Sequence, residues 1–406
     1  MLKAYRYRIY PNKEQEEFFI KTFGACRFVW NKMLEEKLGY LNRKEKIPRI
    51  TPAKYKKEYP FLKDVDSLAL ANIQLQNEKA FRDYFKNSKC FKLPKFKKKK
   101  NKQSYTTNNV NNSIKIDFEN ELVFLPKIKS GIKTVFHRTF IGKIKSATIT
   151  KTKTEKYFVS ILVEIEQQSN LQQPQDKICG IDLGLKNFAI ITNEKGQITK
   201  IDSPKYLHRA EKRLKRQQRQ LSKKQKGSKN KERQRVRLAK LHEYIINARN
   251  DFLHKLSSTI IRENQTIVVE NLNVKGLSQT NLSKNILDNS LRKFLTYLNY
   301  KAQWHNRTII VADRFYQSSK TCSVCGSINH KLTLKDRIWI CEKCGTYHDR
   351  DINASVNLML YGIKQVGMEQ PEFTPVNYAL TAERDLSRST SYHRMKQEAY
   401  TSIGGR

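Results

Sequence analysis

Four cysteines fall into two pairs with the spacing of a zinc-binding ribbon. The pattern is C-x2-C-x15-C-x2-C, and a glycine follows the second cysteine of each pair. Two residues between paired thiolates let backbone amides turn toward the sulfurs, and four thiolates complete a tetrahedral Zn²⁺ sphere. We therefore predict a structural rather than a catalytic zinc site, with rubredoxin-type iron as the alternative. Its ligands are Cys322, Cys325, Cys341 and Cys344.

Three carboxylates stand beside apolar segments in which an unpaired charge would be costly. Asp182 and Glu270 interrupt runs typical of buried strands, and Asp351 precedes a helical pattern. A buried carboxylate is destabilising unless it is paired or binds a metal ion. Each acid alone could be a helix cap or half of an ion pair. In the order strand, strand, helix, they are typical of an RNase H-like nuclease, whose carboxylates hold two divalent ions about 3.5–4 Å apart.

The ion expected at Asp182, Glu270 and Asp351 is Mg²⁺, or Mn²⁺ in its place. Mg²⁺ suits such an open site because it binds carboxylate oxygens and keeps several waters. One ion would activate a water molecule, and the other would stabilise the leaving 3′ oxygen. Two neighbours are considered separately: we expect His348 to be structural, and we keep Asp349 as an alternative or auxiliary ligand.

The periodicity of apolar residues predicts the elements that must position these groups. A strand at residues 1–10 is followed by helices at 13–39 and about 67–88, and then by short strands between 113 and 168. We expect the first strand to join the later ones in a β-barrel or sandwich, with the helices inserted between them.

From residue 178 the pattern becomes α/β. Two apolar strands are joined through Gly184, and a long basic helical hairpin turns near Gly227. Further elements are predicted as helices or strands by their period. They are helices around 252–261 and 291–305 and strands at 266–269 and 308–312.

The composition indicates a polyanionic partner. The chain has 406 residues, with 79 Lys and Arg against 38 Asp and Glu, which gives a net charge of +41. This balance excludes most ordinary metabolic enzymes and favours nucleic acid as the partner. No apolar run approaches the roughly 20 residues of a membrane helix, and no secretion signal is recognisable, so we expect a cytoplasmic protein without a membrane partner.

Two segments concentrate the positive charge. Residues 92–102 hold seven lysines in eleven positions, and residues 205–240 hold sixteen basic and two acidic residues. A charge run is often a solvated helix face, but at this net charge we expect both segments to contact nucleic acid. The side chains proposed for this contact are Lys97, Lys98, Lys99, Arg213, Arg216, Lys223 and Lys224.

Several motifs together resemble the TnpB proteins, transposon-encoded relatives of type V CRISPR effectors. These motifs are RIYPN at 8–12, GIDLGLKNFAI at 180–190, IVVENL at 267–272, the four-cysteine ribbon, and HDRDINASVNL at 348–358. The resemblance extends over about residues 1–362. It implies that Asp182, Glu270 and Asp351 are the acids of a RuvC-type nuclease, since the last acid of the family stands in D-x-N-A.

The resemblance also implies a multidomain α+β fold with a split N-terminal domain and a split nuclease domain. Its parts are a β-barrel wedge domain (1–10 and 103–170), an inserted helical recognition domain (11–102), an RNase H-like (RuvC) α/β nuclease domain (177–319 and 346–367), an inserted zinc ribbon (320–345) and a disordered tail (368–406).

The activity implied by the resemblance is RNA-guided cleavage of double-stranded DNA beside a short target-adjacent motif, by two-metal-ion hydrolysis. The guide RNA would come from the end of an insertion sequence. The protein would act as a monomer within a ribonucleoprotein, in a prokaryotic cytoplasm and near the nucleoid. Three alternatives stay open: a transposase that joins DNA strands, a guided repressor without cleavage, and a basic RNA-binding protein with structural carboxylates.

By the same resemblance, side chains that read the target-adjacent motif are expected on the helix near residues 67–76. Asn72, Gln74 and Gln76 can bond to base edges, and Asn and Gln pair bidentately with adenine. The alternative for each of them is an ordinary solvent-facing position on the helix.

Overall fold

The chain divides into two compact units, each with its own sheet. One unit holds residues 1–168 and 220–240, and the other holds 169–219 and the residues from 241 onward. The computed structural model describes residues 1–368 except 101, 167–176, 274–275, 277–278, 280–282 and 334. The predicted disordered tail at 368–406 therefore lies outside the described residues, apart from Met368.

The first unit contains a seven-stranded antiparallel sheet in the order β2-β6-β7-β1-β5-β4-β3. The strands are β1 (Leu2–Tyr10), β2 (Gln103–Asn108), β3 (Lys115–Asp117), β4 (Leu122–Phe124), β5 (Ile132–Val135), β6 (Lys143–Lys151) and β7 (Tyr157–Glu164). Strand β1 pairs with β7, so the first strand does join the later ones as expected. Among the described residues β2 and β3 do not pair with each other, so the sheet has two ends and the predicted barrel is not closed by hydrogen bonds.

Helices are inserted between β1 and β2. They are α1 (Lys13–Asn42), α2 (Pro52–Glu58) and α3 (Ser67–Lys86), with a 3-10 turn at Pro60–Lys63. Helix α1 begins at a capping box, because the Asn12 side chain accepts from the Gln15 N–H at 2.8 Å and the Gln15 side chain accepts from the Asn12 N–H at 3.0 Å. Phe19 and Met33 of α1 and Leu70 of α3 are buried in the core that these helices share with the sheet.

The second unit contains a five-stranded sheet in the order β10-β9-β8-β11-β12. The strands are β8 (Ile178–Leu183), β9 (Asn187–Asn193), β10 (Ile198–Asp202), β11 (Thr266–Val269) and β12 (Thr308–Val311). Strands β8, β9 and β10 run antiparallel, whereas β11 runs parallel to β8 and β12 runs parallel to β11. The carboxyl ends of β8, β11 and β12 therefore meet at one edge, in agreement with the predicted α/β unit.

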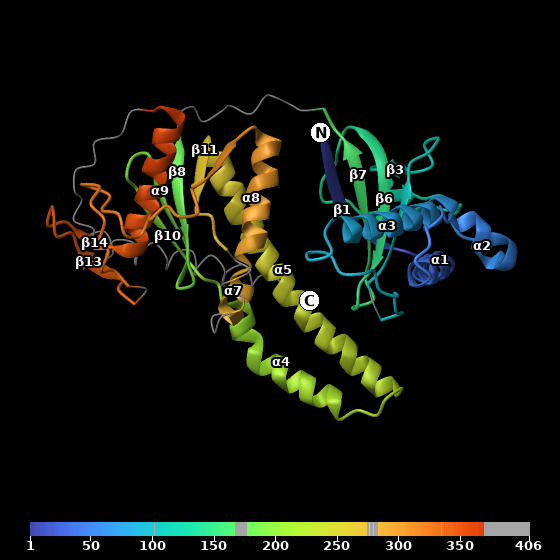
Figure 1. Cartoon of the computed structure of the whole chain (residues 1–406). Coiled ribbons are helices and arrows are strands. Elements are labelled where there is room, and N and C mark those ends of the chain that lie inside the picture. The colour runs from blue at the N-terminus through green and yellow to red at the C-terminus, as the bar shows by residue number, and fades with distance from the viewer. Residues whose placement is uncertain are drawn as a thin grey trace. The chain divides into compact units, whose positions relative to one another are not determined.

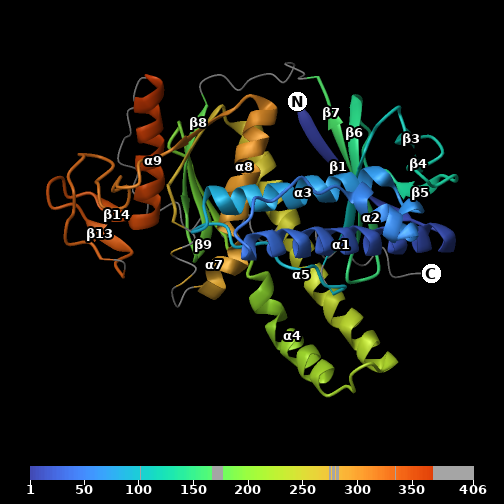
Figure 2. The same cartoon turned by 45° about the vertical axis from the view of Figure 1, so that its right-hand side comes forward.

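Helices cover both faces of this sheet. One face lies against α5 (Lys229–Glu263) and α8 (Leu291–His305), and the other lies against α9 (Arg350–Val366) (Figures 1 and 2). Because successive side chains of a strand point to opposite faces, Cys179 and Ile181 enter the core beneath α5 and α8. Asp182, by the same alternation, faces α9.

Two glycines let α9 approach the sheet closely. A Cβ atom on Gly180 would collide with the Ser355 carbonyl and would lie 2.9 Å from the Met359 Cα. A Cβ atom on Gly362 would collide with Val268 and would lie 2.8 Å from the Ile178 Cδ1. Gly180 contacts Ser355 and Met359, whereas Ile178, two residues earlier in β8, contacts Gly362 near the end of α9. The start of α9 therefore lies at the carboxyl end of β8.

A buried carboxylate fixes the base of the helical hairpin, which is formed by α4 (Tyr206–Ser222) and α5. Asp288, in α7 (Ser283–Asn289), accepts from the Leu207 N–H at 3.0 Å and from Arg249 Nη2 at 2.8 Å. The hairpin turns where expected, since Gly227 has φ +87°. None of the helices in the described part of the chain is long and apolar enough to span a membrane.

We predict that Gly180→Ala lowers the free energy of unfolding by about 1–3 kcal/mol, because the added Cβ meets backbone atoms that cannot rotate away. Chemical denaturation measures this loss. Gly24→Ala is the matched control, since its nearest contact would be a side-chain nitrogen at 4.0 Å. That control should be neutral or stabilising by up to about 1 kcal/mol. Equal effects of the two substitutions would contradict the close approach of α9.

Candidate active site

The strand register aligns two of the three predicted acids in one row. Val269 of β11 is level with Ile181 of β8, so Glu270 and Asp182 follow as neighbours at the carboxyl edge. Both side chains are half-buried and lie on the α9 face. Asp351 is in the first turn of α9, which reaches the same edge through the contact at Gly180. The three acids come from two strands and one helix, as the sequence predicts.

The acids are electrostatically coupled. Burial, followed by the negative charges of Glu270 and Asp351, raises the pKa of Asp182 to about 8. Burial also raises the pKa of Glu270 above its ordinary value. Arg350 and Arg337 act in the opposite direction on Asp182. A site that holds carboxylates together against their mutual repulsion is suited to cations.

Asp351 is held by an arginine that the sequence analysis did not single out. Arg337 Nη1 lies 2.9 Å and 2.7 Å from the two carboxylate oxygens of Asp351. Arg337 comes just before β13 (Ile338–Ile340) of the ribbon, which pairs with β14 (Tyr347–Asp349). In the sequence, Arg337 is distinguished only as a basic residue near the second cysteine pair.

Asp349 has a different task from Asp351. Its side chain caps α9 by accepting from the Asp351 N–H at 3.0 Å and the Ile352 N–H at 3.2 Å, and it also lies 3.3 Å from Lys200 Nζ. Asp349 therefore acts as the cap of α9, whereas Asp351 is the acid whose charge acts on Asp182, which favours Asp351 as the metal ligand.

The donor set fits Mg²⁺ or Mn²⁺, because hard divalent cations prefer carboxylate oxygen. Among the described residues, only the four cysteines have ligand atoms that all lie within 4.8 Å of one another. The three acids do not form so tight a group.

The four cysteines do form a closed cluster. Their sulfurs lie 3.6 Å apart in the pairs Cys322–Cys344 and Cys325–Cys341. A tetrahedron with Zn–S bonds of about 2.3 Å has edges of about 3.8 Å, so the separation fits Zn²⁺. Each cysteine pair forms a knuckle that is followed by a glycine with positive φ. Gly326, for example, has φ +73°.

Hydrogen bonds surround these sulfurs. Ser327 Oγ lies 3.1 Å from both Cys325 Sγ and Cys341 Sγ, and its hydroxyl lowers the pKa of Cys325. His348 is buried, with Nε2 3.1 Å from Cys322 Sγ and its ring 4.6 Å from that of Trp339. Its burial and its contact with the cysteine cluster support the structural role predicted for His348.

Two buried asparagines join the ribbon to α9. Asn353 Nδ2 donates to the Thr321 carbonyl at 2.7 Å, and its Oδ1 accepts from the Ser323 N–H at 3.0 Å. Asn357 Nδ2 donates to the Ser318 carbonyl at 2.7 Å. The loop that carries the first cysteine pair is thus fastened to the same helix turn that presents Asp351.

The proposed nucleic-acid side chains differ in availability. Lys97 lies over the Trp30 ring at 3.8 Å and its backbone bonds to Asn31, so this lysine is half-buried. The other six basic side chains are exposed: Lys98, Lys99, Arg213, Arg216, Lys223 and Lys224.

The three amide side chains on α3 also differ. Asn72 Nδ2 donates to the Thr106 carbonyl of β2 at 3.0 Å, and Gln74 is buried and donates to Glu78 at 2.8 Å. Only Gln76 is exposed. The free side chain that could reach a base from this set is therefore Gln76.

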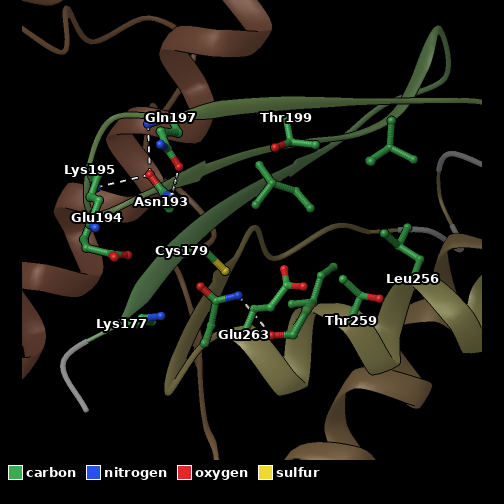
Figure 3. A pocket seen from close by; sticks show the side chains of 14 residues that line it. Lys177, Cys179, Asn193, Glu194, Lys195, Gln197, Thr199, Leu256, Thr259 and Glu263 are labelled. Carbon is green, nitrogen blue, oxygen red and sulfur yellow. Dashed lines mark hydrogen bonds between the residues drawn. The ribbon is translucent and has the colours of Figure 1, made fainter. Parts of the chain in front are cut away.

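A cavity of about 350 Å³ lies on the opposite side of the sheet from the acids (Figure 3). Cys179 forms part of its wall, and Thr259 and Glu263 of α5 lie across from Asn193, at the end of β9, and Lys195, in the β9–β10 turn. None of the predicted acids lines it. The cavity therefore belongs to a different face from the candidate site.

Family models match three parts of the chain. A family described as probable transposase matches residues 160–281, and the TNB domain of Cas12f1-like proteins matches 292–358. A model described as a helix-turn-helix domain matches residues 1–46. That last segment folds here as strand β1 and the single helix α1.

Curated relatives and a solved structure agree with these matches. A Streptomyces pristinaespiralis protein described as a candidate RNA-guided DNA endonuclease is 32% identical, with 89% of each chain covered. An Escherichia coli K12 protein with the same description is 27% identical, over 89% of this chain and 92% of the relative. The Cas12f1 protein, solved as a complex with sgRNA and target DNA, shares the fold at 15% identity and a TM-score of 0.54, covering 86% of this chain and 83% of that one.

We predict that Asp182→Asn stabilises the protein without Mg²⁺ by at least about 1 kcal/mol at pH 8. The folded-state pKa of about 8 lies above the ordinary value of 3.8, so the native state binds the extra proton. Stability should therefore fall as pH rises from about 4 to about 8, and the substitution should remove that part of the slope. Urea unfolding at pH 6 and pH 8 measures both effects.

The control is Asp251→Asn, which changes an exposed acid of α5. It should leave the pH slope as in the wild type. A slope for Asp182→Asn equal to that of the wild type would contradict the raised pKa of Asp182.

We predict that Cys341→Ser reduces zinc content and loosens the start of α9, because the ribbon and this helix share hydrogen bonds. Elemental analysis measures the zinc, and hydrogen exchange measures the backbone around Asp351. Cys90→Ser, at an exposed cysteine, is the control. Unchanged zinc and unchanged exchange in Cys341→Ser would contradict the assignment.

Proposed function

The chain belongs to the TnpB family of transposon-encoded proteins, and on this basis we propose that it is an RNA-guided endonuclease that cuts double-stranded DNA. The observation that carries the proposal is the group of three acids at one edge of the second sheet, beneath the start of α9. The descriptions of its relatives support the RNA guide and the DNA target.

In this proposal Asp182, Glu270 and Asp351 bind the divalent ions with their carboxylate oxygens. Mg²⁺ or Mn²⁺ would supply the activation of water and the stabilisation of the leaving 3′ oxygen. Arg350 and Arg337 lie close enough to act on Asp182 electrostatically, so they also favour the approach of a phosphate. Arg337 contacts both oxygens of Asp351, so a bound ion would share this carboxylate with the arginine or compete with it.

The ribbon would hold Zn²⁺ in a structural role. Four thiolates leave no open position for substrate, and the neighbouring hydroxyl and imidazole groups stabilise their negative charge. Bound Zn²⁺ would keep the first cysteine loop folded against Asn353, two residues after Asp351.

The positive charge would hold the guide RNA and the target strand. A guide–target heteroduplex is bound through its backbone, which requires basic side chains rather than base readers. The exposed residues of 205–240 and Lys98 and Lys99 can supply these contacts, whereas Lys97 supplies packing against Trp30. Gln76 is the amide we propose for contact with the target-adjacent motif.

The strand-joining transposase and the repressor without cleavage make different predictions. A transposase would join a 3′-OH end to target DNA in vitro, and we expect no joined product. A repressor would bind its target without cutting it. We further propose a monomeric ribonucleoprotein in a prokaryotic cytoplasm, near the nucleoid.

We predict that Asp182→Ala, Glu270→Ala and Asp351→Ala each abolish Mg²⁺-dependent cleavage while RNA and DNA binding persist. The reason is that each removes a proposed metal ligand and leaves the basic surfaces intact. A gel assay for cleavage and a filter assay for binding measure the two properties. Surviving cleavage in any one variant would mean that this acid is not a ligand.

Two controls separate metal binding from the mere loss of a carboxylate. Glu263→Ala removes an acid on the opposite face of the sheet and should leave cleavage unchanged. Asp349→Ser keeps a side chain that caps α9 and should retain cleavage. Loss of cleavage in Asp349→Ser with the fold preserved would move the third ligand from Asp351 to Asp349.

A further inference from the structure

A short turn follows β12 at the same edge of the sheet as the acids. Strand β12 is the neighbour of β11, with Val311 level with Val269, so Ala312 is level with Glu270. The Ala312 N–H donates to the Val269 carbonyl at 2.9 Å. Neighbouring strands lie about 4.8 Å apart, so the residues after Ala312 begin one strand spacing from Glu270.

Hydrogen bonds give this turn a defined shape. The Asp313 carboxylate accepts from the Phe315 N–H at 2.8 Å, and the Asp313 carbonyl accepts from the Tyr316 N–H at 3.1 Å. Tyr316 then packs against α9, since its hydroxyl donates to the Asn357 carbonyl at 3.0 Å and its ring lies 4.8 Å from that of Tyr361. The turn is therefore held by its own hydrogen bonds and by the contacts of Tyr316 with α9.

The turn presents an aromatic ring to solvent. Phe315 is 83% exposed, and among the large exposed hydrophobic side chains of the described residues only Ile141, at 93%, is more exposed. Arg314 is also exposed, with its guanidinium 6.0 Å from the Phe315 ring. An exposed apolar side chain on its own needs no explanation, but here it lies at the edge that carries the acids.

An exposed aromatic ring beside an exposed arginine is suited to binding single-stranded nucleic acid. Single-stranded nucleic acid is bound by aromatic rings on which bases stack and by basic side chains that contact the phosphates. Pairing of a guide with its target displaces the other DNA strand as a single strand. A strand with unpaired bases is thus the substrate form that such a surface would receive at the acids.

We infer that Phe315 and Arg314 form a subsite for the DNA strand being cut: an unpaired base stacks on the Phe315 ring, and Arg314 contacts an adjoining phosphate. The inference rests on the proposed nuclease function and adds a substrate contact to it. Asp313 contributes to the shape of the turn, because its Oδ1 accepts from the Phe315 N–H.

The test uses the full chain loaded with RNA and a matching DNA target. Phe315→Ala should lower the cleavage rate of bound target on the order of tenfold, and Phe315→Trp should restore it. Target binding should change little, because the guide pairing is intact. Leu287→Ala, at another exposed apolar side chain of the same unit, is the control and should cut as the wild type does.

A spectroscopic measurement reports the stacking itself. The fluorescent base 2-aminopurine is placed beside the cut position, and Asp182→Ala prevents cleavage. Binding should quench the base, and adding Phe315→Ala should remove that quenching. Cleavage by the wild type with equal rates and equal quenching in Phe315→Ala would overturn the subsite alone. No cleavage by the loaded wild type would instead refute the nuclease function.

Discussion

The structure of the candidate site depends on one packing constraint, the direct contact of α9 with strand β8. Gly180 has no side chain, and the space of its missing Cβ is filled by the backbone around Ser355 and Met359. Because helix and strand backbones touch there, the first turn of α9 cannot stand off from the sheet. Asp351 is thereby held near Asp182, although the two residues are far apart in the sequence.

This arrangement has an electrostatic cost that the surroundings offset only in part. Asp182 is destabilised as an anion by burial and by Glu270 and Asp351, and its pKa rises to about 8. Arg337 compensates Asp351 from the ribbon side. A strained charge distribution of this kind is typical of functional sites, since a well-packed apolar edge would be more stable and chemically inert. A zinc ion in the ribbon would contribute indirectly, because Asn353 binds the first cysteine loop to α9.

The cysteines, the acids and the basic segments could be picked out from the sequence because the patterns that mark them are local. The cysteine spacing, the acids that interrupt apolar runs and the basic segments each appear within a few residues. The contacts of Lys97 with Trp30 and of Asn72 with β2 could not be predicted, because they join segments distant in the chain. Arg337 was missed for the same reason: an arginine near a cysteine pair has no local pattern that points to a distant carboxylate. The periodicity of apolar residues likewise does not reveal whether the two end strands of a sheet pair with each other.

We propose that the acids at this edge cut DNA chosen by a bound RNA. The most direct measurement is to sequence the RNA that co-purifies with the protein expressed beside its native flanking DNA, and then to replace the 3′ segment of that RNA. We expect one discrete RNA and Mg²⁺-dependent cleavage that moves to the DNA matching the new segment. Cleavage that ignores the replaced segment, or a mixture of unrelated cellular RNAs, would contradict it.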